Sequence, residues 1–104
     1  MVKVNWTNSA LQDLNDIGEY IAKDSLKYAE ITVQELFYHT EILEIYPKTG
    51  KKVEEFNDIS IRELIKGSYR IVYKIISQEQ IDILTVHNCA RLISNTKPFK
   101  KKRK

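Results

Sequence analysis

The stretch from residue 61 to residue 76, IRELIKGSYRIVYKII, constrains the fold of this chain more than any other. Apolar and polar side chains alternate in Ile61–Lys66 and again in Tyr69–Ile76, which is the period of a strand. Gly67-Ser68 separates the two runs, and a two-residue loop that begins with glycine fits a type II′ hairpin turn. We therefore predict an antiparallel hairpin. The expected cross-strand pairs are Lys66–Tyr69, Ile65–Arg70, Glu63–Val72 and Arg62–Tyr73.

Alternation in this register divides the side chains of the hairpin between two faces. The first face carries Arg62, Leu64, Tyr69, Ile71, Tyr73 and Ile75. The second carries Ile61, Glu63, Ile65, Arg70, Val72, Lys74 and Ile76. Because the first face has more aromatic and aliphatic bulk, we expect it to pack under helices. The second face mixes charges with aliphatics, which indicates a surface exposed to solvent or to a partner.

Two amphipathic helices are predicted before the hairpin. The first follows Thr7, a good N-cap, where the spacing of apolar residues changes to three and four. Its apolar face consists of Ala10, Leu11, Leu14, Ile17 and Ile21. The second helix follows Asp24-Ser25 and should run about 20 residues until Pro47 ends it. Only two or three residues separate the two predicted helices, and so short a link favours an antiparallel helical hairpin.

Shorter alternating runs at Val2–Trp6 and Ile81–His87 predict two further strands. The order is then β-α-α-β-β-β, and helices segregated from a mainly antiparallel sheet define an α+β fold. The helical hairpin has one wide apolar stripe, so it should cover one face of the sheet. The opposite face is left for solvent or a partner.

The length of 104 residues fits one domain, and no apolar run approaches the ~20 residues of a membrane span. The N-terminus has no apolar run of signal-peptide length, and the single cysteine, Cys89, cannot form an internal disulfide. These features favour a reducing, cytoplasmic location. His39 and His87 are isolated, and no glycine-rich phosphate loop occurs, so we expect neither a metal nor a cofactor.

The positive charge of the chain is concentrated at its end. Lys97–Lys104 contains six of the 17 lysines and arginines, so the remainder has 11 basic against 14 acidic side chains. A charged terminus of this kind is commonly solvated and frayed. The alternative is that it attracts nucleic acid or an acidic partner.

Four segments of the chain form a further pattern. They are WTNSALQDLNDIGEYIAKDS from Trp6, YPKTGKKVEEF from Tyr46, IRELIKGSYRIVYKI from Ile61 and IDILTVHNCAR from Ile81. In this order and spacing they resemble the RelE/ParE superfamily of toxins from bacterial type II toxin–antitoxin modules, and most of all its ParE branch. The resemblance covers about Val4–Ile93. We therefore place a toxin domain at residues 1–93 and expect a flexible basic tail at residues 94–104.

The resemblance implies a helical hairpin on a curved antiparallel sheet. It also implies an antitoxin partner whose C-terminal segment blocks the working groove. A homodimer of the toxin and a toxin–antitoxin heterotetramer are the two assemblies left open. Two activities occur in the superfamily. RelE-like members cleave mRNA in the ribosome without a metal, whereas ParE-like members stall DNA gyrase with broken DNA.

The resemblance also assigns candidate residues. Arg70 and Arg91 match arginines of the family, but RelE-like enzymes have two lysines near the positions of Ile61 and Glu63. An apolar residue and a carboxylate poorly replace cations around a phosphate. We therefore expect a ParE-like gyrase inhibitor that is not an enzyme. The alternatives are a ribosome-dependent mRNA endonuclease and an inactive member that only binds its antitoxin.

The candidate residues differ between these functions. An endonuclease would use Arg70, Arg91, His87 and Glu63 as catalytic residues. A gyrase inhibitor would use Arg70, Lys74 and Arg91 to bind its partner. Three of the candidates also have a structural interpretation: Arg70 and Glu63 can form an exposed ion pair that contributes little, and His87 can be a hydrogen-bonded strand residue. Arg62, on the helix-facing side, is interpreted as structural.

Overall fold

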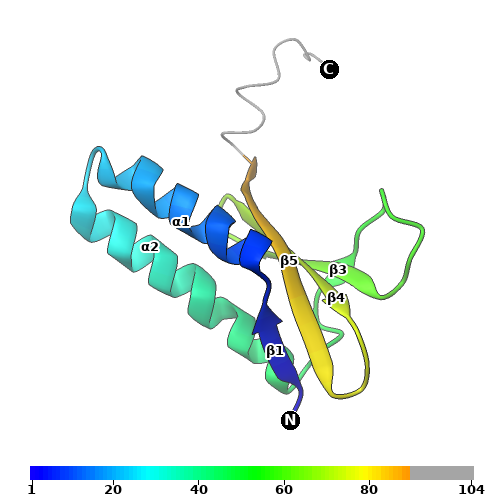
Figure 1. Cartoon of the computed structure of the whole chain (residues 1–104). Coiled ribbons are helices and arrows are strands. Elements are labelled where there is room, and N and C mark those ends of the chain that lie inside the picture. Colours follow the sequence, from blue (N-terminus) through cyan, green and yellow to red (C-terminus); the bar gives the residue numbers. More distant parts are fainter. Residues whose placement is uncertain (90–104) are drawn as a thin grey trace.

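A computed structural model describes residues 1–89, so Arg91 and the predicted tail at 94–104 lie outside the described residues. The elements are β1 (Lys3–Trp6), α1 (Asn8–Ala22), α2 (Leu26–His39), the 3₁₀ helix η1 (Thr40–Glu44), β2 (Lys51–Lys52), β3 (Ile61–Lys66), β4 (Tyr69–Ile75) and β5 (Gln80–Asn88). The two helices run side by side as a hairpin along one side of the sheet, as Figure 1 shows. The α+β architecture expected from the sequence is confirmed.

The strands form one sheet in the order β1-β5-β4-β3-β2. β1 is parallel to β5, and the other neighbours are antiparallel. The two-residue strand β2 was not predicted, because Lys51–Lys52 has no alternating pattern of its own. The first and last described strands therefore lie next to each other, with β1 at one edge of the sheet.

The hairpin of β3 and β4 has the predicted register. Ile65 faces Arg70, Glu63 faces Val72, and Arg62 faces Tyr73. Gly67 has a φ of 62°, in the left-handed region that glycine adopts without a steric penalty. Between β4 and β5 the register shifts next to Val72 and Tyr73, because Leu84 is an extra residue on β5.

Both predicted helix starts are confirmed. The hydroxyl oxygens of Thr7 and Ser25 accept hydrogen bonds from the backbone N–H groups of Ala10 and Tyr28, as N-caps do. The prediction that Leu11 is buried is wrong, because α1 turns this side chain toward solvent. The burial of Ala10, Leu14 and Ile17 shows that the apolar face is narrower than the sequence pattern.

The second helix is shorter than predicted, because α2 ends at His39 and continues as the tighter helix η1. The Thr40 hydroxyl donates a hydrogen bond of 2.8 Å to the Phe37 carbonyl, and the Thr40 backbone N–H bonds to the same oxygen. A β-branched residue whose side chain competes for a helical carbonyl favours such a change. No helix within residues 1–89 is long and apolar enough to cross a membrane.

The core lies between the helical hairpin and the predicted inner face of the sheet. Its buried residues are Ala10, Leu14, Ile17, Leu36, Leu43, Leu64, Ile71, Tyr73, Ile81, Ile83 and Val86. Tyr69 and Ile75, also expected on this face, are partly buried against it. The helices thus cover the face predicted for them, and the opposite, outer face of β3 and β4 is the one that carries Arg70.

Tyr73 connects this core to the turn before β2. Its hydroxyl donates a hydrogen bond of 2.8 Å to the Pro47 carbonyl and accepts one of 3.0 Å from the Gly50 N–H. The Arg62 guanidinium donates to the Gly50 carbonyl at 2.9 Å. The structural interpretation of Arg62 is therefore confirmed: it fixes the turn that leads the chain into the sheet.

Candidate functional site

The outer face of β3 and β4 is partly covered by the segment 53–60, called the strap below. Val53 at its start donates a backbone hydrogen bond to Ile61, and its side chain is buried. The prediction that Val72 lies exposed on the outer face is wrong, since Val72 is only 4% exposed. Local alternation places Val53, like Val72, on the outer face. The outer face therefore has a small apolar centre of its own.

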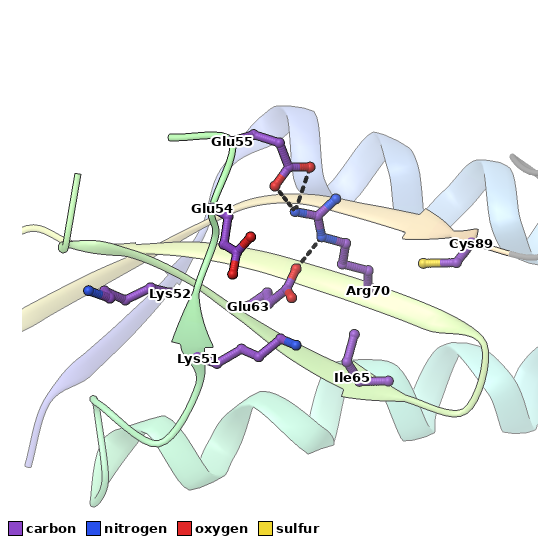
Figure 2. A pocket seen from close by; sticks show the side chains of 8 residues that line it. All are labelled: Lys51, Lys52, Glu54, Glu55, Glu63, Ile65, Arg70 and Cys89. Atoms are coloured by element: carbon purple, nitrogen blue, oxygen red, sulfur yellow. Dashed lines mark hydrogen bonds and ion pairs between the residues drawn. The ribbon is translucent and has the colours of Figure 1, made fainter. Parts of the chain in front are cut away.

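Arg70 of β4 lies between two carboxylates. Its Nε donates to Oε1 of Glu63 on β3, and its terminal NH2 group lies 3.3 Å from Oε1 of Glu55 on the strap. Figure 2 shows the guanidinium with Glu63 on the sheet at one side and Glu55 reaching it from the strap. Sequence reasoning predicted the diagonal contact with Glu63. It missed Glu55, which lies in a segment without periodicity.

Burial differs sharply among these three side chains. The exposed fraction is 10% for Glu63, 23% for Arg70 and 66% for Glu55. Burial opposes the charge of Arg70, but the hydrogen bond and charge of Glu63, followed by those of Glu55, raise the pKa of Arg70. Since Glu63 is nearly buried, the Arg70–Glu63 contact is not the exposed, weak ion pair of the simpler interpretation.

A hollow of about 650 Å³ opens beside this cluster. It is lined by Lys51, Lys52, Glu54, Glu55, Glu63, Ile65, Arg70 and Cys89. Three cations and three carboxylates give this lining no excess charge of either sign. Within residues 1–89, no three His, Cys, Asp or Glu side chains are grouped so that they could hold a metal ion.

The other candidates take different positions. His87 of β5 lies directly opposite Arg70, so the two share the outer face. Lys74 lies further along β4, with its Nζ 3.8 Å from the Asp58 carboxylate of the strap. Arg91 lies outside the described residues. The structure thus brings Arg70, Glu63 and His87 together and places Lys74 at the other end of the strap.

Lys51 and Cys89 were not predicted at the site. A signal for Lys51 existed, because it is the basic residue directly after Gly50 in the segment YPKTGKKVEEF. Cys89, directly after β5, lies at the hollow because its backbone N–H donates to the Ser68 carbonyl at 2.8 Å, which holds it beside the hairpin turn. That contact joins distant residues, so no local pattern indicates it.

The strap should be sensitive to acid. The pKa of Glu55 lies below its usual 4.5, because its own backbone N–H donates to it and because Arg70 is close. The pKa of Asp58 lies below its usual 3.8, because the Ser60 hydroxyl and N–H donate to it. Both folded pKa values are depressed, so each carboxylate stabilises the fold above its unfolded pKa and loses this effect as the pH falls through the folded pKa.

Comparing the wild type with the Glu55→Gln variant isolates the contribution of the Glu55 carboxylate to the stability of the fold. In urea denaturation the wild type should be the more stable protein at neutral pH, and the difference should shrink once the pH falls below 4.5. A difference that is independent of pH across this window would contradict the contact between Glu55 and Arg70.

The family model described as the ParE toxin of type II toxin-antitoxin systems, parDE, matches residues 4–93. No curated protein matches the chain. Among solved structures, one from the chromosomal ParDE toxin–antitoxin system of P. aeruginosa is similar, with 18% identity and a TM-score of 0.69. The match covers 85% of this chain and 96% of that chain.

A second solved structure is similar to a lesser degree. It belongs to the toxin–antitoxin complex RelBE2 from Mycobacterium tuberculosis, with 20% identity and a TM-score of 0.53. The match covers 84% of this chain and 96% of that chain. At these identities the two structures establish the shared fold, and the family rests on the match over residues 4–93.

Proposed function

Because the chain belongs to the family of ParE toxins of type II toxin–antitoxin systems, we propose that it inhibits growth by binding DNA gyrase and is neutralised by a cognate antitoxin. The proposal includes a cytoplasmic location, where both partners occur. It assigns the outer face around Arg70 as the surface that binds the target. Arg70 and Lys74 are the residues on this face that we assign to partner binding.

The ionic environment of Arg70 is the observation that favours a protein target over RNA cleavage. A site for phosphoryl transfer needs unpaired positive charge where the phosphorane develops. The Arg70 guanidinium is instead held by Glu63 and Glu55, and Glu54 adds a third carboxylate to the hollow. With its cations balanced by carboxylates, such a surface offers no excess positive charge to attract an RNA backbone.

We further propose that the antitoxin segment carries acidic side chains, and the ion pairs of the strap support this. Both similar solved structures come from toxin–antitoxin systems. On this chain, Arg70 and Lys74 pair with the strap carboxylates of Glu55 and Asp58, which are both exposed. An antitoxin carboxylate can replace Glu55 at little cost, because exposed ion pairs contribute little. Glu63, by contrast, stays bound because it is nearly buried.

A ribosome-dependent mRNA endonuclease is the second candidate. The observation in its favour is that Arg70 and His87 are directly opposite each other, with Glu63 bonded to Arg70. A cation, an imidazole and a carboxylate on one face are groups that general acid–base cleavage requires. Ile61 and Glu63 lie near the positions where RelE-like enzymes have two lysines, and this difference still weighs against RNA cleavage.

Two parallel assays separate the candidates. Purified protein is expected to inhibit supercoiling of relaxed plasmid by gyrase and to leave mRNA intact in a translation extract. Cleaved mRNA with unaffected gyrase would overturn the proposal in favour of the endonuclease. If both assays are negative and induced expression is harmless, while the protein still binds its antitoxin, the chain is an inactive member.

A further inference from the structure

The strap is anchored at both of its ends. At the first end Val53 is buried, and its N–H donates to the carbonyl of Ile61. At the second end the Ser60 carbonyl accepts a hydrogen bond of 2.8 Å from the N–H of Ile75 on β4. A movement of the strap would therefore hinge at these two anchors.

Between the anchors the strap buries little of its own surface. Every residue from 54 to 59 is exposed, and the apolar side chains of Phe56 and Ile59 are 49% and 72% exposed. This part of the strap encloses a hollow of about 290 Å³ instead of packed side chains. The hollow is lined by Lys52, Val53, Glu54, Phe56, Asn57, Asp58 and Ile59. The hydrophobic effect therefore contributes little to holding residues 54–59 against the sheet.

Two ion pairs join this middle part of the strap to β4. The Glu55 carboxylate lies 3.3 Å from the terminal NH2 group of Arg70, as Figure 2 shows, and the Asp58 carboxylate lies 3.8 Å from Nζ of Lys74. The exposed fraction is 66% for Glu55 and 42% for both Asp58 and Lys74. Ion pairs this exposed each change an equilibrium by up to about five-fold, so together they favour the closed strap by on the order of ten-fold.

The two cations under the strap have a defined spacing. Arg70 and Lys74 are four residues apart on β4, so they share the outer face and lie about 13 Å apart along the strand. Val72 lies between them on the same face and is buried. An extended segment of another protein matches this row when it carries carboxylates at positions i and i+4 and an apolar residue between them. The strap reaches the same two cations from positions 55 and 58.

We propose that the strap is an autoinhibitory segment, which swings away from β4 when the target protein binds. In the free protein, Glu55 and Asp58 hold the two cations that carboxylates of the target take in the complex. The inference rests on the proposed function in assigning the outer face to the target. Because the strap must open first, the wild type binds on the order of ten-fold more weakly than a protein whose strap is released.

The variant Glu55→Gln, Asp58→Asn tests this inference, because it removes both ion pairs. Its asparagine keeps a side-chain oxygen for Ser60, whose N–H and hydroxyl donate to Asp58 at 2.9 Å and 2.6 Å. In a supercoiling assay the variant should inhibit gyrase at about one tenth of the wild-type concentration. The matched control is Glu30→Gln, Glu41→Gln, which removes the same two charges from exposed positions on α2 and η1 and should inhibit as the wild type does.

A second measurement does not depend on gyrase. The probe is a synthetic five-residue peptide with glutamates at its first and fifth positions and valine at its third, titrated into isotope-labelled protein and followed by NMR. The peptide should bind the strap variant about ten-fold more tightly than the wild type, and it should shift the strap resonances of the wild type as the strap is displaced. A peptide with glutamines in place of both glutamates should bind neither protein.

The outcomes separate this inference from the proposed function. Equal peptide affinity for the variant and the wild type, a peptide that binds neither protein at millimolar concentration, or strap resonances that stay unchanged on binding would overturn the inference. Gyrase that is inhibited equally by both proteins would overturn it too, while the proposed function would stand. Tighter peptide binding by the variant, with gyrase unaffected by either protein, would support the autoinhibitory strap and contradict gyrase as the target.

Discussion

Gly50→Ala is expected to lower the free energy of unfolding by about 3 kcal/mol and the melting temperature by roughly 15 °C. A Cβ at position 50 would lie 2.5 Å from the Glu63 carbonyl oxygen and 2.6 Å from the Tyr73 hydroxyl. Neither atom can move away, because one belongs to the backbone of a central hairpin and Tyr73 is fully buried. The two hydrogen bonds that join Tyr73 to the turn would also be strained.

Gly67→Ala is the matched control for this substitution. Gly67 has a positive φ, but no atom lies within 4 Å of the place that a Cβ would occupy, so alanine there should cost only about 1 kcal/mol. The two variants separate steric exclusion from backbone freedom. Thermal unfolding followed by circular dichroism is the measurement. A Gly50→Ala protein that melts within a few degrees of Gly67→Ala would contradict the packing of Tyr73 against the turn.

Removing the Arg70 guanidinium should abolish toxicity in cells that express the protein. An anchor of this kind at the centre of an interface contributes about 2 kcal/mol or more, which corresponds to roughly a 30-fold loss of target affinity. Arg70→Ala also leaves Glu63 as a nearly buried carboxylate without a partner, which costs about 2 kcal/mol of stability. The single variant therefore confounds loss of function with loss of fold.

The double variant Arg70→Ala, Glu63→Gln resolves this difficulty, because it removes the orphan charge. It should melt near the wild type and still permit growth on induction. Lys27 is an exposed cation near the start of α2, on the side of the sheet opposite Arg70. The Lys27→Ala variant should therefore remain fully toxic. Full toxicity of the folded double variant would show that Arg70 lies outside the working surface.

Local patterns predicted the fold well. Alternation and the Gly67-Ser68 loop determined the hairpin register, and the residues Thr7 and Ser25 marked the helix starts. What local patterns could not give was contacts between distant residues. The parallel pairing of β1 with β5 joins residues more than 70 positions apart, and it decides which strand lies at the edge.

The candidate site was predicted less completely, for a similar reason. Register placed Arg70 and Glu63 on one face, and the position of β5 added His87. The path of the strap decides the rest, since it buries Val72 and brings Glu55 to Arg70. A segment without periodicity carries no signal of the face it crosses, so the second partner of Arg70, Glu55, could not be anticipated.

Inhibition of gyrase by the purified protein and by the Arg70→Ala, Glu63→Gln variant tests the central proposal most directly. In a supercoiling assay with increasing toxin, the wild type is expected to block supercoiling and to accumulate cleaved plasmid. The double variant should require about 30-fold more protein for the same effect. Unimpaired supercoiling in the presence of excess wild-type toxin, or equal inhibition by the two proteins, would contradict the proposal.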